Sequence, residues 1–167
     1  MYDELTEVDI KKMQEELEHR IIVLRPELIE DVKVARAFGD LSENFEYKAA
    51  KREKNRNDSR IRYLENMIKT ARIIKSNAKD GEIGLFDKVE LYFEDEDETQ
   101  NIQIVTTLRQ NVLKGLISKE SPVGKAVMGH KAGERVRVEV SSDYCYYVII
   151  RSVEKGSDDE SLPISAF

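Results

Sequence analysis

Two carboxylates, Asp40 and Glu43, lie three residues apart in the stretch 38–47, between two long helical patterns. Proteins bind Mg²⁺ through one or two carboxylates together with waters and phosphate oxygens. This pair is too few to hold the ion alone, so it would complete a metal site shared with a partner. The same spacing also resembles a capping box, in which both carboxylates accept hydrogen bonds at a helix start. Ser42 is a suitable cap by itself, and the sequence leaves both interpretations open.

Cationic and aromatic side chains surround this pair. Four basic residues flank it: Arg36, Lys48, Lys51 and Arg52. They form either a solvated charged face or a collar that contacts nucleic-acid phosphates. The rings of Phe45 and Tyr47 are candidates for stacking on a base, although Tyr47 fits a helical seam equally well. The sequence contains no Ser/His/Asp or Cys/His arrangement, phosphate-binding loop or paired CxxC that indicates another catalytic site.

Two helices must position this stretch, one over residues 6–37 and one over 43–75. Thr6 and Asp9 resemble a capping pair at the start of the first helix. Pro26 predicts a kink near residues 24–25, and Gly39 ends the helical pattern. Apolar residues recur every three or four positions, as in a coiled-coil seam: Ile10, Met13, Leu17, Ile21, Leu24, Leu28, Val32 and Ala35, then Tyr47, Ala50, Ile61, Leu64, Ile68 and Ala71.

The short connection makes the two helices antiparallel neighbours, with the stretch 38–47 as their exposed tip. Residues 1–47 carry 6 Lys/Arg and 13 Asp/Glu, whereas residues 48–78 carry 10 Lys/Arg and 3 Asp/Glu. Opposite net charges favour side-by-side pairing of the two arms. Lys54 and Asn57 occupy seam positions, so we expect looser or hydrogen-bonded packing there.

Beyond residue 79 the apolar period changes from helical to alternating, which predicts strands near 88–93, 102–104, 136–140 and 145–153. Ser121 as a cap and Pro122 in the first turn predict a short helix over Val123–Met128. The sequence thus predicts an α+β chain in three parts. These parts are a helical hairpin over 1–78, a small antiparallel sheet domain with one short helix over 79–155, and a mobile polar tail over 156–167.

Composition narrows the class of protein further. No apolar run approaches the ~18 residues of a membrane span, and the acidic N-terminus does not resemble a signal peptide. The single cysteine, Cys145, cannot form an internal disulfide, which fits a reducing compartment. We therefore expect a cytoplasmic protein without a membrane partner.

Three segments resemble the bacterial Gre transcript-cleavage factors. Residues 36–51, RAFGDLSENFEYKAAK, resemble the tip pattern A-R-x-x-G-D-L-x-E-N-x-E-Y-x-A-A of that family. Residues 25–28, RPEL, resemble its first helix, and residues 116–126, LISKESPVGKA, resemble a segment of its second domain. The likeness covers about residues 5–155 in the same order and spacing, and the A subtype fits best.

The resemblance implies an antiparallel coiled coil followed by an FKBP-like domain. Factors of this family bind bacterial RNA polymerase, and we expect this chain to do so as a monomer with no catalytic site of its own. The globular domain, here with Ser121 and Pro122, docks at the rim of the secondary channel, and the coiled coil enters it.

The family likeness also gives the tip residues their expected tasks. Asp40 and Glu43 would help to hold the second Mg²⁺ of the polymerase and position the attacking water, with no cofactor bound stably by the factor alone. Backtracked nascent RNA is then cut near its 3′ end. Arg36 and Lys51 match basic positions that face this RNA.

Some residues depart from the family pattern. Phe45 replaces a small residue, Ser42 replaces Lys or Arg, and the tail after Lys155 exceeds the usual length. One rival function is a Gre-like inhibitor in the same channel, but such relatives alter the tip acids that this chain keeps. A peptidyl-prolyl isomerase needs an aromatic-lined pocket for which few residues are present, and a plain coiled-coil module does not explain the tip.

Overall fold

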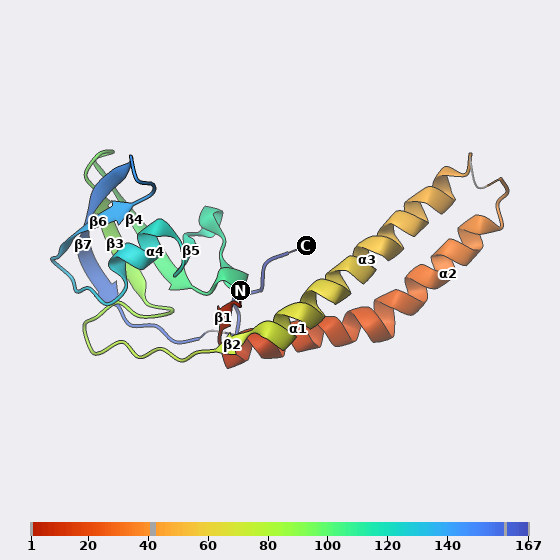
Figure 1. Ribbon diagram of the computed structural model, residues 1–167, viewed down its shortest axis with the longest axis horizontal. Coiled ribbons are helices and arrows are strands. Elements are labelled where there is room, and N and C mark those ends of the chain that lie inside the picture. The colour runs from red at the N-terminus through yellow and green to blue at the C-terminus, as the bar shows by residue number, and fades with distance from the viewer. Residues whose placement is uncertain (1, 41–42, 159, 167) are drawn as a thin grey trace. The chain divides into compact units, whose positions relative to one another are not determined.

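The computed structural model describes residues 2–40, 43–158 and 160–166. These residues form two compact units, the first from residues 2–3 and 10–71 and the second from residues 4–9 and 72–166. A helical hairpin makes up the first unit and a small sheet organises the second (Figure 1). The predicted α+β class is confirmed.

The hairpin consists of two antiparallel helical arms (Figure 1). The first arm comprises α1 (Glu7–His19), a π-helical segment (Arg20–Leu24) and α2 (Arg25–Arg36), and the second arm is α3 (Phe45–Thr70). Within the described part of the chain, none of the helices is both long and apolar enough to cross a bilayer.

A π-helical segment lies just before Pro26, where the sequence predicts a kink. Pro26 has no N–H and cannot donate to the carbonyl four residues earlier. Just before it, the N–H of Arg25 bonds to the carbonyl oxygen of Arg20, five residues back. The proline is accommodated at the start of α2, where a missing N–H is tolerated, and the first arm continues as one helical rod.

A polar layer interrupts the seam of the hairpin. Asn57 is buried and hydrogen bonded to Arg20, whose Nη1 donates to the Asn57 Oδ1 at 2.9 Å. Arg60, only 4% exposed, donates to both carboxylate oxygens of Glu16 at 2.8 and 3.2 Å. Arg20 Nε also donates to Glu16. The expectation of hydrogen-bonded packing near Asn57 is confirmed.

The second helix is shorter than predicted. It ends at Thr70 because Ala71 takes an extended conformation, with ψ at 140°. The chain then forms β2 (Arg72–Ile73), which pairs in parallel with β1 (Glu4–Leu5). The predicted capping pair is confirmed at the start of α1, where the Thr6 N–H donates to Asp9 Oδ2 at 3.0 Å and the Asp9 N–H donates to Thr6 Oγ1 at 3.3 Å.

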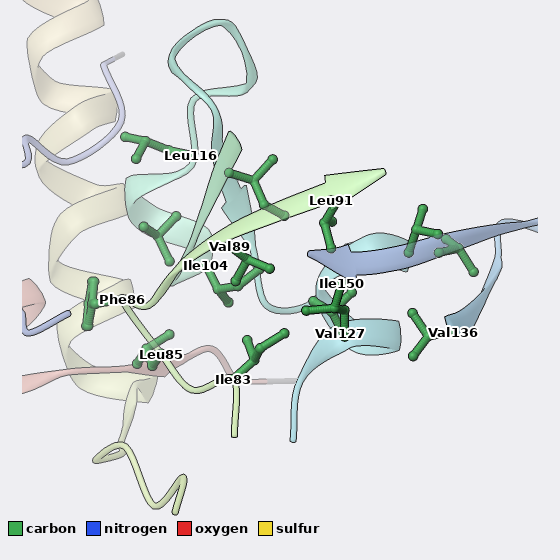
Figure 2. Packing of buried hydrophobic residues seen from close by; sticks show 14 residues of the cluster. Ile83, Leu85, Phe86, Val89, Leu91, Ile104, Leu116, Val127, Val136 and Ile150 are labelled. Atoms are coloured by element: carbon green, nitrogen blue, oxygen red, sulfur yellow. The ribbon is translucent and has the colours of Figure 1, made fainter. Parts of the chain in front are cut away.

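The second unit contains a five-stranded sheet whose inner face packs on α4 (Pro122–Val127). Alternating residues of the strands, such as Val89 and Leu91, join Val127 of α4 in one buried cluster (Figure 2). The strands lie in this order: β5 (Leu116–Ser118), β4 (Glu98–Val105), β3 (Lys88–Phe93), β7 (Cys145–Glu154) and β6 (Arg135–Glu139).

One strand pairing differs from the expected antiparallel sheet. The four strands β4, β3, β7 and β6 pair antiparallel, but β5 pairs in parallel with β4. The long connection over residues 106–115 carries the chain back so that β5 starts at the same end as β4. It contains two short 3₁₀ helices, Thr107–Arg109 and Val112–Lys114.

Described residues of the tail contact the second unit, and the mobility of the tail stays a prediction. Asp158 contacts the fully buried guanidinium of Arg109 at 2.5 Å and accepts a hydrogen bond from the Thr6 hydroxyl at 2.7 Å. Arg109 also bonds to the buried carboxylate of Asp9 at 2.6 Å. Further along, the N–H of Ser165 donates to the Leu108 carbonyl. The buried cation thus recruits an anion from the tail.

Candidate functional site

The acidic tip, residues 38–47, begins where α2 runs out of helical hydrogen bonds. The N–H of Ala37 still donates to Lys33 and Val34 carbonyls, and that of Phe38 donates to Ala35. Gly39 then has φ at 131°, a conformation that side-chain-bearing residues rarely adopt. The prediction that Gly39 ends the first helix is confirmed.

Asn44 organises the far side of the tip. Its Oδ1 accepts a hydrogen bond from the Tyr47 N–H at 3.0 Å, which makes Asn44 the N-cap of α3. Its Nδ2 donates to the Ala35 carbonyl at 2.6 Å, in the last turn of α2. One side chain therefore caps one helix and ties it to the end of the other. Neither Asp40 nor Glu43 is the cap of α3, and Ser42, with Leu41, lies outside the described residues.

Both predicted carboxylates are exposed at the end of the hairpin. Asp40 and Glu43 line an open hollow of about 360 Å³ together with Asn44, Glu46 and two phenylalanines. Among the residues that the structure describes, no group of three or more His, Cys, Asp or Glu side chains is arranged to hold a metal. That Asp40 and Glu43 share a Mg²⁺ ion with a partner stays a prediction.

The structure brings several of the predicted basic residues onto aromatic rings. The Arg36 guanidinium lies 5.5 Å from the centroid of the Tyr47 ring, and the Lys51 ammonium lies 6.0 Å from the same centroid. Lys48 lies 5.8 Å from the centroid of Phe45. Arg36 at the end of α2 and Lys51 on α3 thus gather around one ring, and cation–π attraction holds their charges beside the tip.

Arg52 and the predicted docking residues take no part in these ring contacts. Arg52 is exposed on α3, one helical turn beyond Lys48. Ser121 and Pro122 belong to the second unit, at the start of α4. The Ser121 Oγ accepts a hydrogen bond from the Gly124 N–H at 3.0 Å, which confirms the predicted cap, and the Pro122 side chain is exposed beside it.

Comparisons with known proteins match both parts of the chain. Residues 4–73 match the model of the N-terminal domain of the transcription elongation factor family GreA/GreB, and residues 78–155 match that of its C-terminal domain. The chain belongs to the GreA/GreB family. The predicted resemblance, including its A-subtype character, is therefore confirmed.

Proteins named transcription elongation factor GreA are similar to this chain over most of their length. Transcription elongation factor GreA of Mesoplasma florum is 40% identical over 136 residues, covering 81% of this chain and 87% of the relative. GreA of Caldanaerobacter subterraneus is 42% identical over 137 residues, again covering 81% and 87%. The crystal structure of GreA factor homolog 1 (Gfh1) of Thermus thermophilus is 28% identical, covers 93% of this chain and 100% of that one, and superposes with a TM-score of 0.39. That score is too low for the superposition to bear on function.

Two tip residues, Asn44 and Phe38, have structural roles that the sequence analysis does not predict. Asn44 caps α3, and an Asn three residues before Tyr47 at a helix start is a strong capping signal. Phe38 is 68% exposed and lines the hollow beside the carboxylates. The sequence signal for an exposed Phe38 is its position next to Gly39 at the predicted tip.

Proposed function

We propose that this protein stimulates the cleavage of backtracked nascent RNA by bacterial RNA polymerase. The acidic tip enters the secondary channel of the polymerase, and the second unit docks at the rim through the segment that contains Ser121 and Pro122. The observation that carries the proposal is the pair Asp40 and Glu43, exposed at the end of a helical hairpin in a chain of the GreA/GreB family.

The tip carboxylates supply what a polymerase active centre needs for hydrolysis. Asp40 and Glu43 would complete the ligand set of a Mg²⁺ ion that the polymerase and the RNA phosphate also bind. When bound, that ion activates water and neutralises charge on the phosphate that is attacked. The carboxylates themselves accept hydrogen bonds from the attacking water and orient it. Asn44 ties the start of α3 to the end of α2, the two helix ends that flank these carboxylates.

The basic residues of the tip orient the RNA. Arg36 and Lys51, gathered around Tyr47, present two positive charges next to the acids. Lys48 and Arg52 extend this charge along α3. Charge neutralisation of the RNA backbone would hold its 3′ segment beside the carboxylates without regard to sequence.

A gel assay of labelled RNA tests the proposal. Halted, backtracked polymerase complexes should release short 3′ fragments faster when the protein is added. Asp40→Asn and Glu43→Gln, which keep the size of the side chains, should each lower the rate by roughly 100-fold or more. Both variants should still compete with the wild-type protein for the polymerase, because the docking segment is unchanged.

The second candidate is inhibition of the polymerase through the same channel. It is favoured if the wild-type protein binds the complex, slows nucleotide addition and never accelerates cleavage. The exposed carboxylate pair argues for stimulation, because a blocking tip has no need of acids that reach a shared metal.

A further inference from the structure

The acidic tip exposes two large aromatic side chains that the hairpin does not use. Phe38 follows α2 and is 68% exposed, and Phe45 opens α3 and is 81% exposed. Neither ring contributes to the buried seam, which is formed by residues such as Val32 and Ala35. Single exposed apolar residues are ordinary, but a pair at one functional tip suggests a binding partner.

Both rings line the same open hollow of about 360 Å³. Its other walls are polar: Asp40, Glu43, Asn44 and Glu46. A purely apolar partner would bury these carboxylates in apolar surroundings, which is costly. The hollow therefore suits a flat ligand that has an apolar face and hydrogen-bond donors on its edge.

A nucleobase has this chemistry, and the surroundings of Phe45 favour a nucleotide. Bases stack on aromatic side chains through their faces, while amino groups on their edges donate to acceptors such as carboxylates. Lys48, 5.8 Å from the Phe45 ring centroid, places a cation where the phosphate of a stacked nucleotide can be neutralised. Because 81% of Phe45 stays exposed beside Lys48, the ring remains available for stacking.

We propose that Phe38 and Phe45 form a stacking site for an unpaired base of the backtracked RNA, directly beside Asp40 and Glu43. The inference rests on the proposed function and names the part of the substrate that the tip holds. The two phenylalanines are positioning residues, since they fix the nucleotide while the carboxylates act on the water. Stacking accepts every base because every base has a π-face, and larger purines are held best.

The test compares two substrates and two double variants. Backtracked polymerase complexes are prepared with either adenine or an abasic nucleotide as the extruded 3′ residue. The variant Phe38→Leu with Phe45→Leu keeps apolar bulk and removes the rings, whereas Phe38→Tyr with Phe45→Tyr keeps the rings. Both positions are mostly exposed, so melting temperatures should match the wild type. Cleavage rate is measured against protein concentration, with competition for the polymerase as a binding control.

With the adenine substrate, the leucine variant should cleave roughly 5- to 100-fold more slowly, or need that much more protein, as expected for lost base stacking. The tyrosine variant should behave like the wild type. With the abasic substrate, all three proteins should be equally slow. If the leucine variant loses the same fraction of the cleavage rate on both substrates, or loses none on either, the stacking site is overturned. Stimulation by the wild-type protein in that experiment still supports the proposed function. No stimulation by the wild type on any substrate rejects the proposed function itself.

Discussion

Replacing Asn44 by alanine should disorder the acidic tip without unfolding the hairpin. The substitution removes two hydrogen bonds at once, the cap from the Tyr47 N–H at 3.0 Å and the tie to the Ala35 carbonyl at 2.6 Å. Asn44→Asp separates the two effects. Aspartate caps a helix as well as asparagine does, but its carboxylate cannot donate to Ala35.

The expected magnitudes follow from the two bonds. Loss of an N-cap side chain costs about 1 kcal/mol, and a half-buried hydrogen bond contributes about 1 kcal/mol. Asn44→Ala should therefore destabilise the start of α3 by about 2 kcal/mol, and Asn44→Asp by about 1 kcal/mol. If α3 opens locally at the tip, a loss of about 2 kcal/mol corresponds to roughly 30-fold faster amide exchange at Tyr47.

Hydrogen exchange and RNA cleavage measure this effect together. Tyr47 amide exchange should accelerate in the order wild type, Asn44→Asp, Asn44→Ala, and stimulated cleavage should fall in the same order while binding to the polymerase persists. Asn55→Ala is the matched control, because Asn55 is exposed in the middle of α3 and alanine favours a helix interior. The reasoning fails if Asn44→Ala and Asn55→Ala give the same exchange rate and the same cleavage.

Three further predictions concern the charged contacts that stabilise the two units. Arg60→Met should lower the free energy of unfolding by up to about 3 kcal/mol in urea titrations followed by circular dichroism, because Glu16 loses its bidentate partner; a change within about 0.5 kcal/mol would contradict it. Burial raises the pKa of Glu16, but hydrogen bonds from Arg60 and Arg20 outweigh it and keep that pKa below its ordinary value. The stabilisation from ionised Glu16 is present above the unfolded pKa of about 4.3 and is lost as pH falls through the lower folded pKa. Glu16→Gln should therefore weaken the decrease in melting temperature on the acid side of a pH profile. A profile for the variant that runs parallel to that of the wild type would refute this prediction. Asp158→Asn weakens the charged contact with Arg109 and should lower the free energy of unfolding by about 1.5–3 kcal/mol. It should also speed proteolysis of the tail. An unchanged digestion rate would show that the Asp158–Arg109 contact does not hold the tail.

The hairpin was largely predictable because its signals are local. A seam with a period of three to four residues sets the helices, and Pro26 marks the one place where the helical bonding must change. The sequence did not reveal that this change would be a π-helical segment, since the arrangement depends on which carbonyl the Arg25 N–H reaches. It also could not show that Asn57 would meet Arg20, because that pairing depends on the register of two arms.

The second unit was less predictable where short elements depend on distant partners. The two-residue strand β1 forms only by pairing with β2. In this pairing Glu4 lies opposite Arg72, which is 68 residues later in the sequence. The parallel pairing of β5 with β4 has no local signature in a three-residue strand. The tail was expected to be mobile from its polar composition, and its contact with Arg109 spans 49 residues of sequence.

At the site, residue types were more predictable than their contacts. The positions of Asp40 and Glu43 at an exposed tip followed from the glycine break between two helices. The alternative prediction that Asp40 and Glu43 cap α3 was wrong, because Asn44 is the cap. The gathering of Arg36 and Lys51 around Tyr47 needed the two arms in register.

We propose that the tip completes the active centre of a polymerase. The most direct measurement is the rate of 3′ fragment release from a backtracked complex, with wild-type protein and with Glu43→Gln at saturating concentration. The account predicts strong acceleration by the wild type and roughly 100-fold less by Glu43→Gln, with equal occupancy of the polymerase. Equal rates for the two proteins at equal occupancy would contradict it.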